Sequence, residues 1–144
     1  MTTVGWILET KGHEIWSVSP DGTVYDAIKL MADKNLGALV VLEGDQMKGI
    51  VSERDYARKV ILRGKSSKET LVEEIMSTDV VTIRPEQSIN ECMTLMTNKR
   101  IRHLPVLENE KLVGMISIGD VVKAIISEQE FTIKQLENYI TGSR

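Results

Sequence analysis

Cysteine, aromatic residues and long apolar runs are scarce in this chain of 144 residues. Its single cysteine, Cys92, allows no disulfide within the chain, which predicts a reducing compartment such as the cytoplasm. No run of ~18 or more apolar residues is present, so we expect no membrane-spanning helix and no membrane partner. The opening segment "MTTVGWILETKG" lacks the basic stretch and apolar core of a secretion signal.

Motifs that mark catalysis or metal binding are also missing. The two histidines, His13 and His103, lie far apart and without the spacing of metal ligands. Cys92 lies with Ile89 and Met96 on an apolar helix face, and no base is placed beside it. There is no Walker phosphate loop and no Gly-x-Gly-x-x-Gly, and the net charge of −3 disfavours nucleic acid. We therefore expect no enzyme, no metal site and no nucleic-acid partner.

What the chain does contain is a repeated motif. "GIVSERD" at 49–55 and "GMISIGD" at 114–120 both read Gly, two apolar residues, Ser, two variable positions and Asp. Ser52 and Ser117 are 65 positions apart, and so are Asp55 and Asp120. The same offset aligns residues 16–61 with 81–126 without a gap, including "LVVLE" with "LPVLE". The sequence is therefore a tandem repeat of two copies.

Each copy predicts the order strand, helix, strand, strand, helix. A short strand, "IWSV" or "VVTI", ends near a proline, and a helix with one apolar face follows from Thr23 or Ser88. A buried strand, "GALVVL" or "HLPVL", leads through a polar hairpin to "MKGIV" or "LVGMI", and then directly into the second helix. We expect an α+β fold, α/β-like in its units, in which two pseudo-symmetric copies pack on each other.

Three segments lie outside the repeat. A polar linker, Gly64–Lys68, is followed by a short amphipathic turn, "VEEIM", before the second copy. The tail "FTIKQLENYITGSR" is predicted to extend the last helix. Its apolar residues Phe131, Leu136 and Ile140 could dock on a neighbour or on the N-terminal "VGWIL".

Two interpretations of Ser-x-x-Asp stay open. The pattern is a capping box or a close relative, and Thr23-x-x-Asp26 and Ser88-x-x-Glu91 repeat its spacing at the other helix starts. The two Ser-x-x-Asp sites, however, follow a strand directly, where open α/β folds bind ligands. An ionised carboxylate there can accept both hydroxyls of a ribose. The interpretations are compatible, because a capping Asp is already oriented.

The duplicated block, together with "NKRIRHLPVLENEKLVGMIS", resembles tandem CBS (cystathionine β-synthase) domains over nearly the whole chain, most closely those of small stand-alone bacterial proteins. The resemblance implies two β-α-β-β-α repeats packed as one CBS-pair module. Repeat 1 with the N-terminal segment would span 1–66, and repeat 2 with the C-terminal helix 67–144. Two clefts between the repeats would bind AMP, ADP, ATP, NAD(H) or S-adenosylmethionine.

The resemblance also implies site residues. Asp55 and Asp120 would bind ribose beside Ser52 and Ser117, adenine would meet the first and the buried strand of each copy, and phosphates would need basic groups. The expected ligand residues are Ser17, Val18, Gly37, Ala38, Leu39, Ser52, Arg54 and Asp55 in copy one, and Thr82, Ile83, Arg102, His103, Leu104, Pro105, Ser117, Ile118, Gly119 and Asp120 in copy two. Arg58, Arg63 and Arg100 are further candidates for phosphate.

The copies differ where it matters for a ligand, because Glu53-Arg54 in copy one stands where copy two has Ile118-Gly119. We therefore expect two unequal clefts. His103 has two interpretations, a partly buried side chain bonded to backbone or a donor in the cleft. The predicted function is a cytoplasmic, homodimeric adenine-nucleotide sensor that acts on a regulated protein partner and needs no catalytic cofactor. The alternative is a ligand-free interaction scaffold of the same fold.

Overall fold

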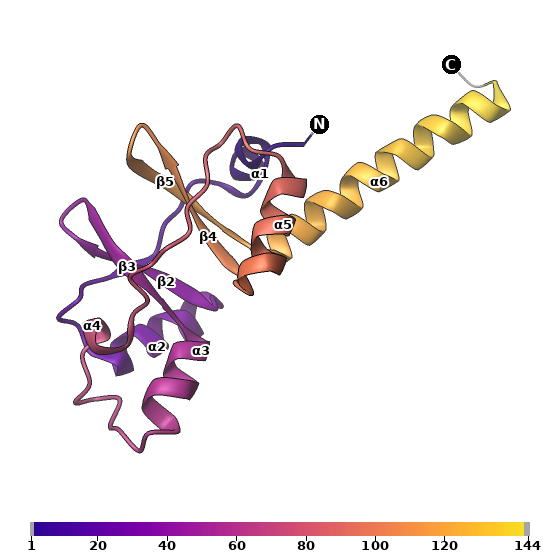
Figure 1. Cartoon of the computed structure of the whole chain (residues 1–144). Coiled ribbons are helices and arrows are strands. Elements are labelled where there is room, and N and C mark those ends of the chain that lie inside the picture. The colour runs from indigo at the N-terminus through magenta and orange to yellow at the C-terminus, as the bar shows by residue number, and fades with distance from the viewer. Residues whose placement is uncertain (1, 143–144) are drawn as a thin grey trace. The chain divides into compact units, whose positions relative to one another are not determined.

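A computed structural model describes residues 2–142 of the chain and divides them into two compact units. One unit consists of residues 14–81, and the other of residues 2–13 with 82–142. The fold is α+β, as the sequence predicts, and each unit contains one copy of the repeat (Figure 1). Among residues 2–142, no helix is both long and apolar enough to cross a membrane.

The unit of residues 14–81 is built on a three-stranded sheet of order β1-β2-β3. β1 pairs parallel to β2, and β2 pairs antiparallel to β3 across the predicted hairpin. Thr23 caps the first helix, because its side-chain oxygen accepts a hydrogen bond from Asp26 N at 3.1 Å. The elements are β1 (Ser17–Val18), α2 (Val24–Lys34), β2 (Ala38–Glu43), β3 (Gln46–Ser52), α3 (Glu53–Tyr56), the π-helix η1 (Ala57–Ile61) and α4 (Val72–Ile75).

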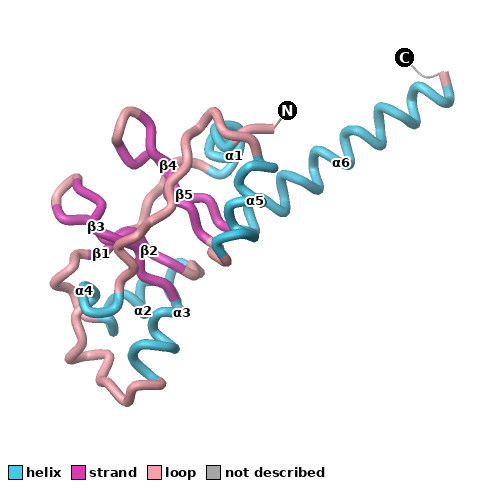
Figure 2. The backbone as a smooth tube through the Cα atoms, viewed as in Figure 1, coloured by secondary structure: helices cyan, strands magenta, loops and turns pink. Residues whose placement is uncertain are grey.

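The second unit repeats this order around an antiparallel pair of strands, β4 and β5. Ser88 caps the helix equivalent to α2 by accepting from Glu91 N at 3.2 Å. The last helix is much longer than its counterpart in the first unit (Figure 2). The elements are α1 (Val4–Lys11), α5 (Ile89–Lys99), β4 (His103–Glu108), β5 (Lys111–Ser117) and α6 (Ile118–Thr141).

The predicted first strand of each copy is shorter than expected. "IWSV" forms only β1, and "VVTI" forms a single parallel bridge between Ile83 and Val106. Ile83 N donates to Pro105 O at 3.0 Å, and Leu107 N donates to Ile83 O at 2.8 Å. The next parallel rung would need an N–H from Pro105, which proline lacks. Copy one has Val40 at the equivalent position, and there the ladder continues to Ser17.

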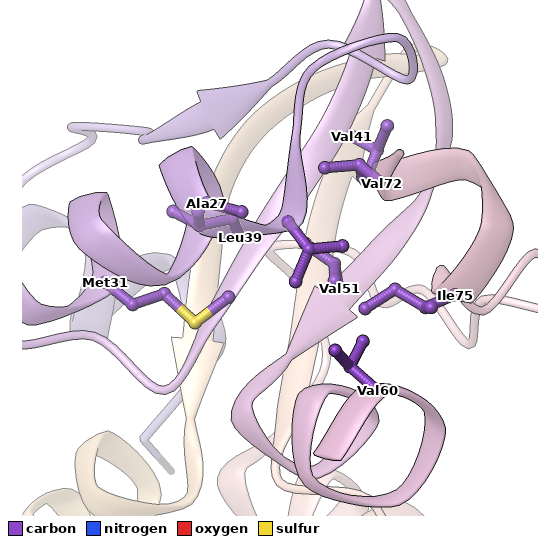
Figure 3. Packing of buried hydrophobic residues seen from close by; sticks show 9 residues of the cluster. Ala27, Met31, Leu39, Val41, Val51, Val60, Val72 and Ile75 are labelled. Carbon is purple, nitrogen blue, oxygen red and sulfur yellow. The ribbon is translucent and has the colours of Figure 1, made fainter. Parts of the chain in front are cut away.

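The core of residues 14–81 joins apolar side chains from five elements (Figure 3). Ala27 and Met31 come from the predicted apolar face of α2, and they pack with side chains of β2, β3, η1 and α4. Burying one Val, Leu or Ile side chain contributes about 1.5–3 kcal/mol, so this cluster is the main source of stability of the unit. Its buried members are Val24, Ala27, Met31, Leu39, Val41, Val51, Val60, Val72 and Ile75.

The helices that precede the two copies are themselves equivalent. Gly5 N donates to Pro85 O at 2.9 Å, and Glu73 N donates to Pro20 O at 3.0 Å, so α1 and α4 correspond at an offset of 68 rather than 65. "VGWIL" therefore matches "VEEIM", three positions out of register with the repeat. The offset of 65 hides this match, so from the sequence alone "VEEIM" is predicted to be an isolated turn.

Each of these helices belongs to the unit of the other copy. α1 precedes copy one but packs on β5 and α6, whereas α4 precedes copy two and supplies Val72 and Ile75 to the core of copy one. The compact units therefore differ from the expected ranges 1–66 and 67–144, because residues 2–13 lie with repeat 2 and residues 67–81 with repeat 1. The physical reason is that each sheet needs an apolar helix on a face that its own repeat leaves open.

The glycine that opens each repeated motif allows this packing. A Cβ on Gly114 would lie 2.5 Å from Leu8 Cδ2 of α1, and a Cβ on Gly49 would lie 2.6 Å from Ser77 O and 3.1 Å from Met76 Sδ, just after α4. At such distances something must shift: backbone at Ser77 in the case of Gly49, and the Leu8 side chain in the case of Gly114. The Gly of "GIVS" and "GMIS" therefore lets the incoming helix approach the strand closely.

Candidate ligand-binding site

The first Ser-x-x-Asp sequence forms a complete capping box at the end of β3. Ser52 Oγ accepts from Asp55 N at 3.2 Å, and Asp55 Oδ2 accepts from Ser52 N at 2.9 Å. The second carboxylate oxygen, Oδ1, lies 3.2 Å from Lys59 Nζ, which also donates to Ile75 O at 2.9 Å. These contacts hold the Asp55 side chain in place. The side chain is 12% exposed, so it can still be reached from solvent.

The second sequence forms the same box at the end of β5. Ser117 Oγ accepts from Asp120 N at 3.2 Å, and Asp120 Oδ2 accepts from Ser117 N at 2.9 Å. Its lysine comes from far away in the chain: Lys11 Nζ lies 2.7 Å from Asp120 Oδ2 and donates to Met115 O at 3.1 Å. The Asp120 side chain is 18% exposed. The prediction that both motifs cap helices is confirmed.

Asp120 is held in its ionised form. Burial alone would raise the pKa of this carboxyl, but hydrogen bonds from Lys11 and Ser117 and the charge of Lys11 outweigh it and lower the pKa below its ordinary 3.8. An ionised carboxylate only accepts hydrogen bonds, so it suits donors such as sugar hydroxyls. Ser117 N and Lys11 Nζ both contact Oδ2 of Asp120, whereas Ser52 N and Lys59 Nζ contact different oxygens of Asp55. The two sites therefore differ in how their carboxylates are engaged.

In repeat 1, the sheet brings the expected residues of copy one to the same end as Ser52. Ala38 pairs with Ser52 across β2 and β3, and Glu53 N donates to Gly37 O at 3.1 Å. Ser17 pairs with Val40, two positions further along β2, with Val18 beside it. Ala38 and Leu39 are buried, so a ligand here would meet mainly their backbone, whereas the Arg54 side chain is exposed.

In repeat 2, the equivalent residues gather in the same way. His103 pairs with Ser117 across β4 and β5, and Ile118 N donates to Arg102 O at 2.9 Å. Ile83 lies beside Pro105 through its backbone bond, and Thr82 precedes it in the chain. Leu104 and Pro105 are buried, whereas Arg102, Ile118 and Gly119 are exposed beside the capping box.

The candidate phosphate-binding residues are not equally placed. Arg54 lies inside the first motif and Arg102 beside the second, and both are exposed. Arg100 ends α5 in a left-handed conformation, with φ 54°, where copy one has Asn35. Arg63 follows the end of η1 and lies eight positions after Asp55, so it is the least suited of the group.

Two lysines at these sites are absent from the sequence-based prediction. Lys59 lies four positions after Asp55, and this helical spacing could have indicated the pair. Lys11 is 109 positions from Asp120, so nothing local could have indicated it. Among residues 2–142, no group of three or more His, Cys, Asp or Glu could hold a metal ion.

Comparison with known proteins accounts for the duplicated capping boxes. The pattern of the CBS domain matches this sequence twice, over residues 11–62 and 72–127, which together make up more than half of the chain. The chain belongs to the CBS-domain family. CBS-pair proteins of this kind are generally regulatory, acting as ligand-sensing or scaffold modules, and stand-alone members are typically not catalytic. CBS domains commonly bind adenine nucleotides and commonly form oligomers.

Individual relatives support the same membership over the full length of the repeats. The CBS domain-containing protein CBSX3, mitochondrial, of Arabidopsis thaliana is 43% identical over 98% of this chain and 73% of its own length. A protein with CBS domains from Burkholderia ambifaria MC40-6 is 56% identical, with a TM-score of 0.86 over 89% of this chain and 96% of its own. A hexameric CBS-CP12 protein from bloom-forming cyanobacteria is 33% identical, with a TM-score of 0.74 over 85% of this chain and 70% of its own.

Proposed function

We propose that this chain is an adenine-nucleotide sensor with one binding site per repeat. Each site would be centred on a capping-box carboxylate, Asp55 or Asp120, that accepts ribose hydroxyls. The adenine would lie against the backbone of the first and buried strands, and the basic side chains beside each motif would meet phosphates. AMP, ADP, ATP and NAD(H) are the expected ligands, and no catalytic cofactor is involved.

The observation that carries this proposal is the state of Asp120. Its carboxylate is ionised, mostly buried and fixed by Ser117 and Lys11 at the carboxyl end of a strand. Open α/β sheets bind ligands at this position. Lys11 occupies Oδ2, and we expect a ribose hydroxyl to reach Oδ1. A hydrogen bond to an ionised group contributes about 1.5–3 kcal/mol, enough to dominate the recognition of a sugar.

The two sites are expected to bind unequally. Asp55 already uses one oxygen for Ser52 and the other for Lys59, whereas Ser117 N and Lys11 Nζ share one oxygen of Asp120. A ligand at Asp55 therefore competes with the Lys59 contact. We expect the site of repeat 2 to bind the more tightly, and the site of repeat 1 to favour a ligand whose phosphates reach Arg54.

Occupancy would act by changing the conformational equilibrium of the module. A ligand can shift that equilibrium only as far as it binds one arrangement better than another. The response would be read by a regulated protein partner. A reducing setting such as the cytoplasm fits a chain whose only cysteine, Cys92, is buried and free.

The direct test is a thermal-shift screen with AMP, ADP, ATP, NAD, NADH and S-adenosylmethionine. A ligand at one hundred times its Kd stabilises the folded state by about 2.7 kcal/mol, which is easily detected. The shift should disappear in the Asp55→Ala, Asp120→Ala double variant. The matched control is Asp26→Ala, Glu91→Ala, which removes the acids of the other two capping motifs and should leave the shift unchanged.

A ligand-free interaction scaffold of the same fold is the second candidate. One observation favours it: both carboxylates already have a lysine partner and a serine partner, so neither needs a ligand to be satisfied. Under this alternative no nucleotide shifts the melting temperature of the wild-type chain. A shift that survives in the double variant would instead reject the ribose role of the two acids.

A further inference from the structure

The long helix α6 carries an exposed apolar stripe. Its members are Val122, Ile126, Ile133, Leu136 and Ile140, which are 41%, 48%, 55%, 56% and 80% exposed. The second half of α6 extends past α1 and α5, the helices of its own unit (Figures 1 and 2). Exposed apolar side chains that recur along one face of a helix mark an interaction surface.

The unit itself packs against a different face of α6. Val121 and Ala124 are buried, and Glu128 Oε2 accepts from Thr2 Oγ1 at 2.7 Å and from Thr2 N at 3.1 Å. These positions recur every three or four residues and form the inner face of the helix. The exposed stripe is one position further along, about 100° around the helix axis. It is therefore not a continuation of the core.

The stripe has the spacing of a coiled coil. Counting Gln129 with the five apolar residues, the steps from 122 to 140 are four, three, four, three and four, which is the a/d pattern of a heptad repeat. We call residues 122, 126, 129, 133, 136 and 140 the seam. Isoleucine occupies all three of its a positions, Ile126, Ile133 and Ile140, and the d positions are Val122, Gln129 and Leu136. In parallel coiled coils, β-branched residues at a with leucine at d favour two strands; here all three a residues are β-branched, and Leu136 is the one leucine among the d residues.

We propose that α6 pairs in parallel with α6 of a second copy of this chain, through a coiled coil along the seam. A parallel pair is self-complementary, because each seam residue meets its own counterpart across the two-fold axis. Gln129 would meet Gln129 of the second copy, and a polar pair inside an apolar seam restricts the register. This proposal does not depend on nucleotide binding.

The flanking charges favour the parallel orientation. The e positions include Glu130 and Glu137, and the g positions include Ile125 and Thr132. In a parallel pair, e residues lie beside g residues of the second helix, so each glutamate faces an uncharged side chain. In an antiparallel pair in which Ile133 faces Leu136 of the second helix, Glu130 would lie beside Glu137 of that helix, and this contact would occur twice. Like charges there would oppose that arrangement.

Cysteine cross-linking tests the orientation. In a parallel pair, an Ile140→Cys thiol meets its counterpart, and mild oxidation should give a covalent dimer at micromolar protein. In the antiparallel pair, residue 140 would lie about 16 Å from its counterpart along the axis, since it would face residue 129. The control is Asn138→Cys on the outer f position. Background from native Cys92 is low, because burial, with the nearby charge of Glu91, raises the pKa of its thiol to about 11.

Charge insertion tests the seam itself. Leu136→Glu should raise the dissociation constant of the assembly at least tenfold in sedimentation experiments. Phe131→Glu is the matched control, because Phe131 is 65% exposed but occupies an f position, on the opposite side of α6 from the seam. Both sites lie outside the core, so unchanged circular dichroism and melting temperature will show that the variants fold. Cross-linking at both cysteines or at neither, a monomeric wild type, or a weaker assembly only in Phe131→Glu would overturn the proposal.

Discussion

Lys11 Nζ lies 2.7 Å from Asp120 Oδ2, and this contact joins the end of α1 to the start of α6 across 109 positions of sequence. The same ammonium group donates to Met115 O at 3.1 Å. Lys11 therefore does two things at once. It fixes the N-terminal helix on repeat 2, and it keeps the carboxylate of the proposed ligand site ionised.

Replacing Lys11 should weaken the fold in a pH-dependent way. Lys11→Met is expected to lower the free energy of unfolding by about 0.5 kcal/mol at neutral pH, which is the contribution of a partly exposed ion pair. Because the pKa of Asp120 is lowered in the folded state, its pairing stabilises the protein above its ordinary pKa, 3.8, and this stability is lost as the pH falls through the folded pKa.

Urea unfolding of wild type and Lys11→Met at several pH values measures this effect. The difference in the free energy of unfolding between the two proteins should be constant near neutral pH and should shrink below about pH 4. Lys134→Met, which removes an exposed lysine from the far part of α6, serves as the control. A difference that grows as the pH falls would contradict the assignment of Asp120 as the partner.

The two motif glycines should tolerate alanine poorly. In Gly49→Ala the new Cβ would meet the backbone oxygen of Ser77, which cannot move without shifting the chain after α4. In Gly114→Ala it would meet the Leu8 side chain, which can turn aside in part. Overpacking costs about 1–3 kcal/mol, so we expect both variants to be destabilised and Gly49→Ala to be the worse.

Thermal and urea unfolding measure this ranking, and Gly119→Ala is the comparison. A Cβ on Gly119 would lie 3.6 Å from Ser117 Oγ, an ordinary contact, so this variant should keep wild-type stability or gain slightly. Shortening Leu8 to valine should recover part of the loss in Gly114→Ala. If all three glycine variants proved equally stable, the close approach of α1 and α4 to the strands would be wrong.

Asp120→Ala should weaken nucleotide binding by about 1.5–3 kcal/mol, a factor of roughly ten to one hundred and fifty. The same change in repeat 1, Asp55→Ala, should have the smaller effect, because Lys59 already holds the second oxygen of Asp55. Isothermal titration with the nucleotide that gives the largest thermal shift measures both values. Equal affinity in wild type and in Asp120→Ala, at the same ligand stoichiometry, would remove Asp120 from the site.

Cys92 should be unreactive in the folded protein. Burial raises the pKa of its thiol to about 11, with a further contribution from the charge of Glu91, so almost no thiolate exists near neutral pH. A thiol reagent such as Ellman's reagent should label it only as fast as the chain unfolds, and immediately in concentrated urea. Rapid labelling of the native protein would show that α5 opens far more often than its packing implies.

Much of the fold follows from local pattern. The offset of 65 gives the two copies, and the apolar faces of α2 and α5 follow from helical spacing. The capping boxes at Ser52 and Ser117 need only residues three positions apart. Such features are determined by neighbours in sequence, so they can be recognised without coordinates.

Contacts between distant segments could not be predicted in this way. The match of "VGWIL" with "VEEIM" is displaced by three positions, and neither segment shows by itself that it packs on the other repeat's sheet. The shortened ladder at Ile83 depends on Pro105, a residue of a strand formed later in the chain.

By itself the sequence determined that there are two similar halves, which elements each contains, and that an acid stands at the end of one strand in each. Only the tertiary structure decided that the helix before each half completes the other half, and that the two acids receive their lysines from different places. The physical reason is that capping and periodicity act over a few residues. Apolar burial and ion pairing, in contrast, depend on which surfaces the folded chain brings together.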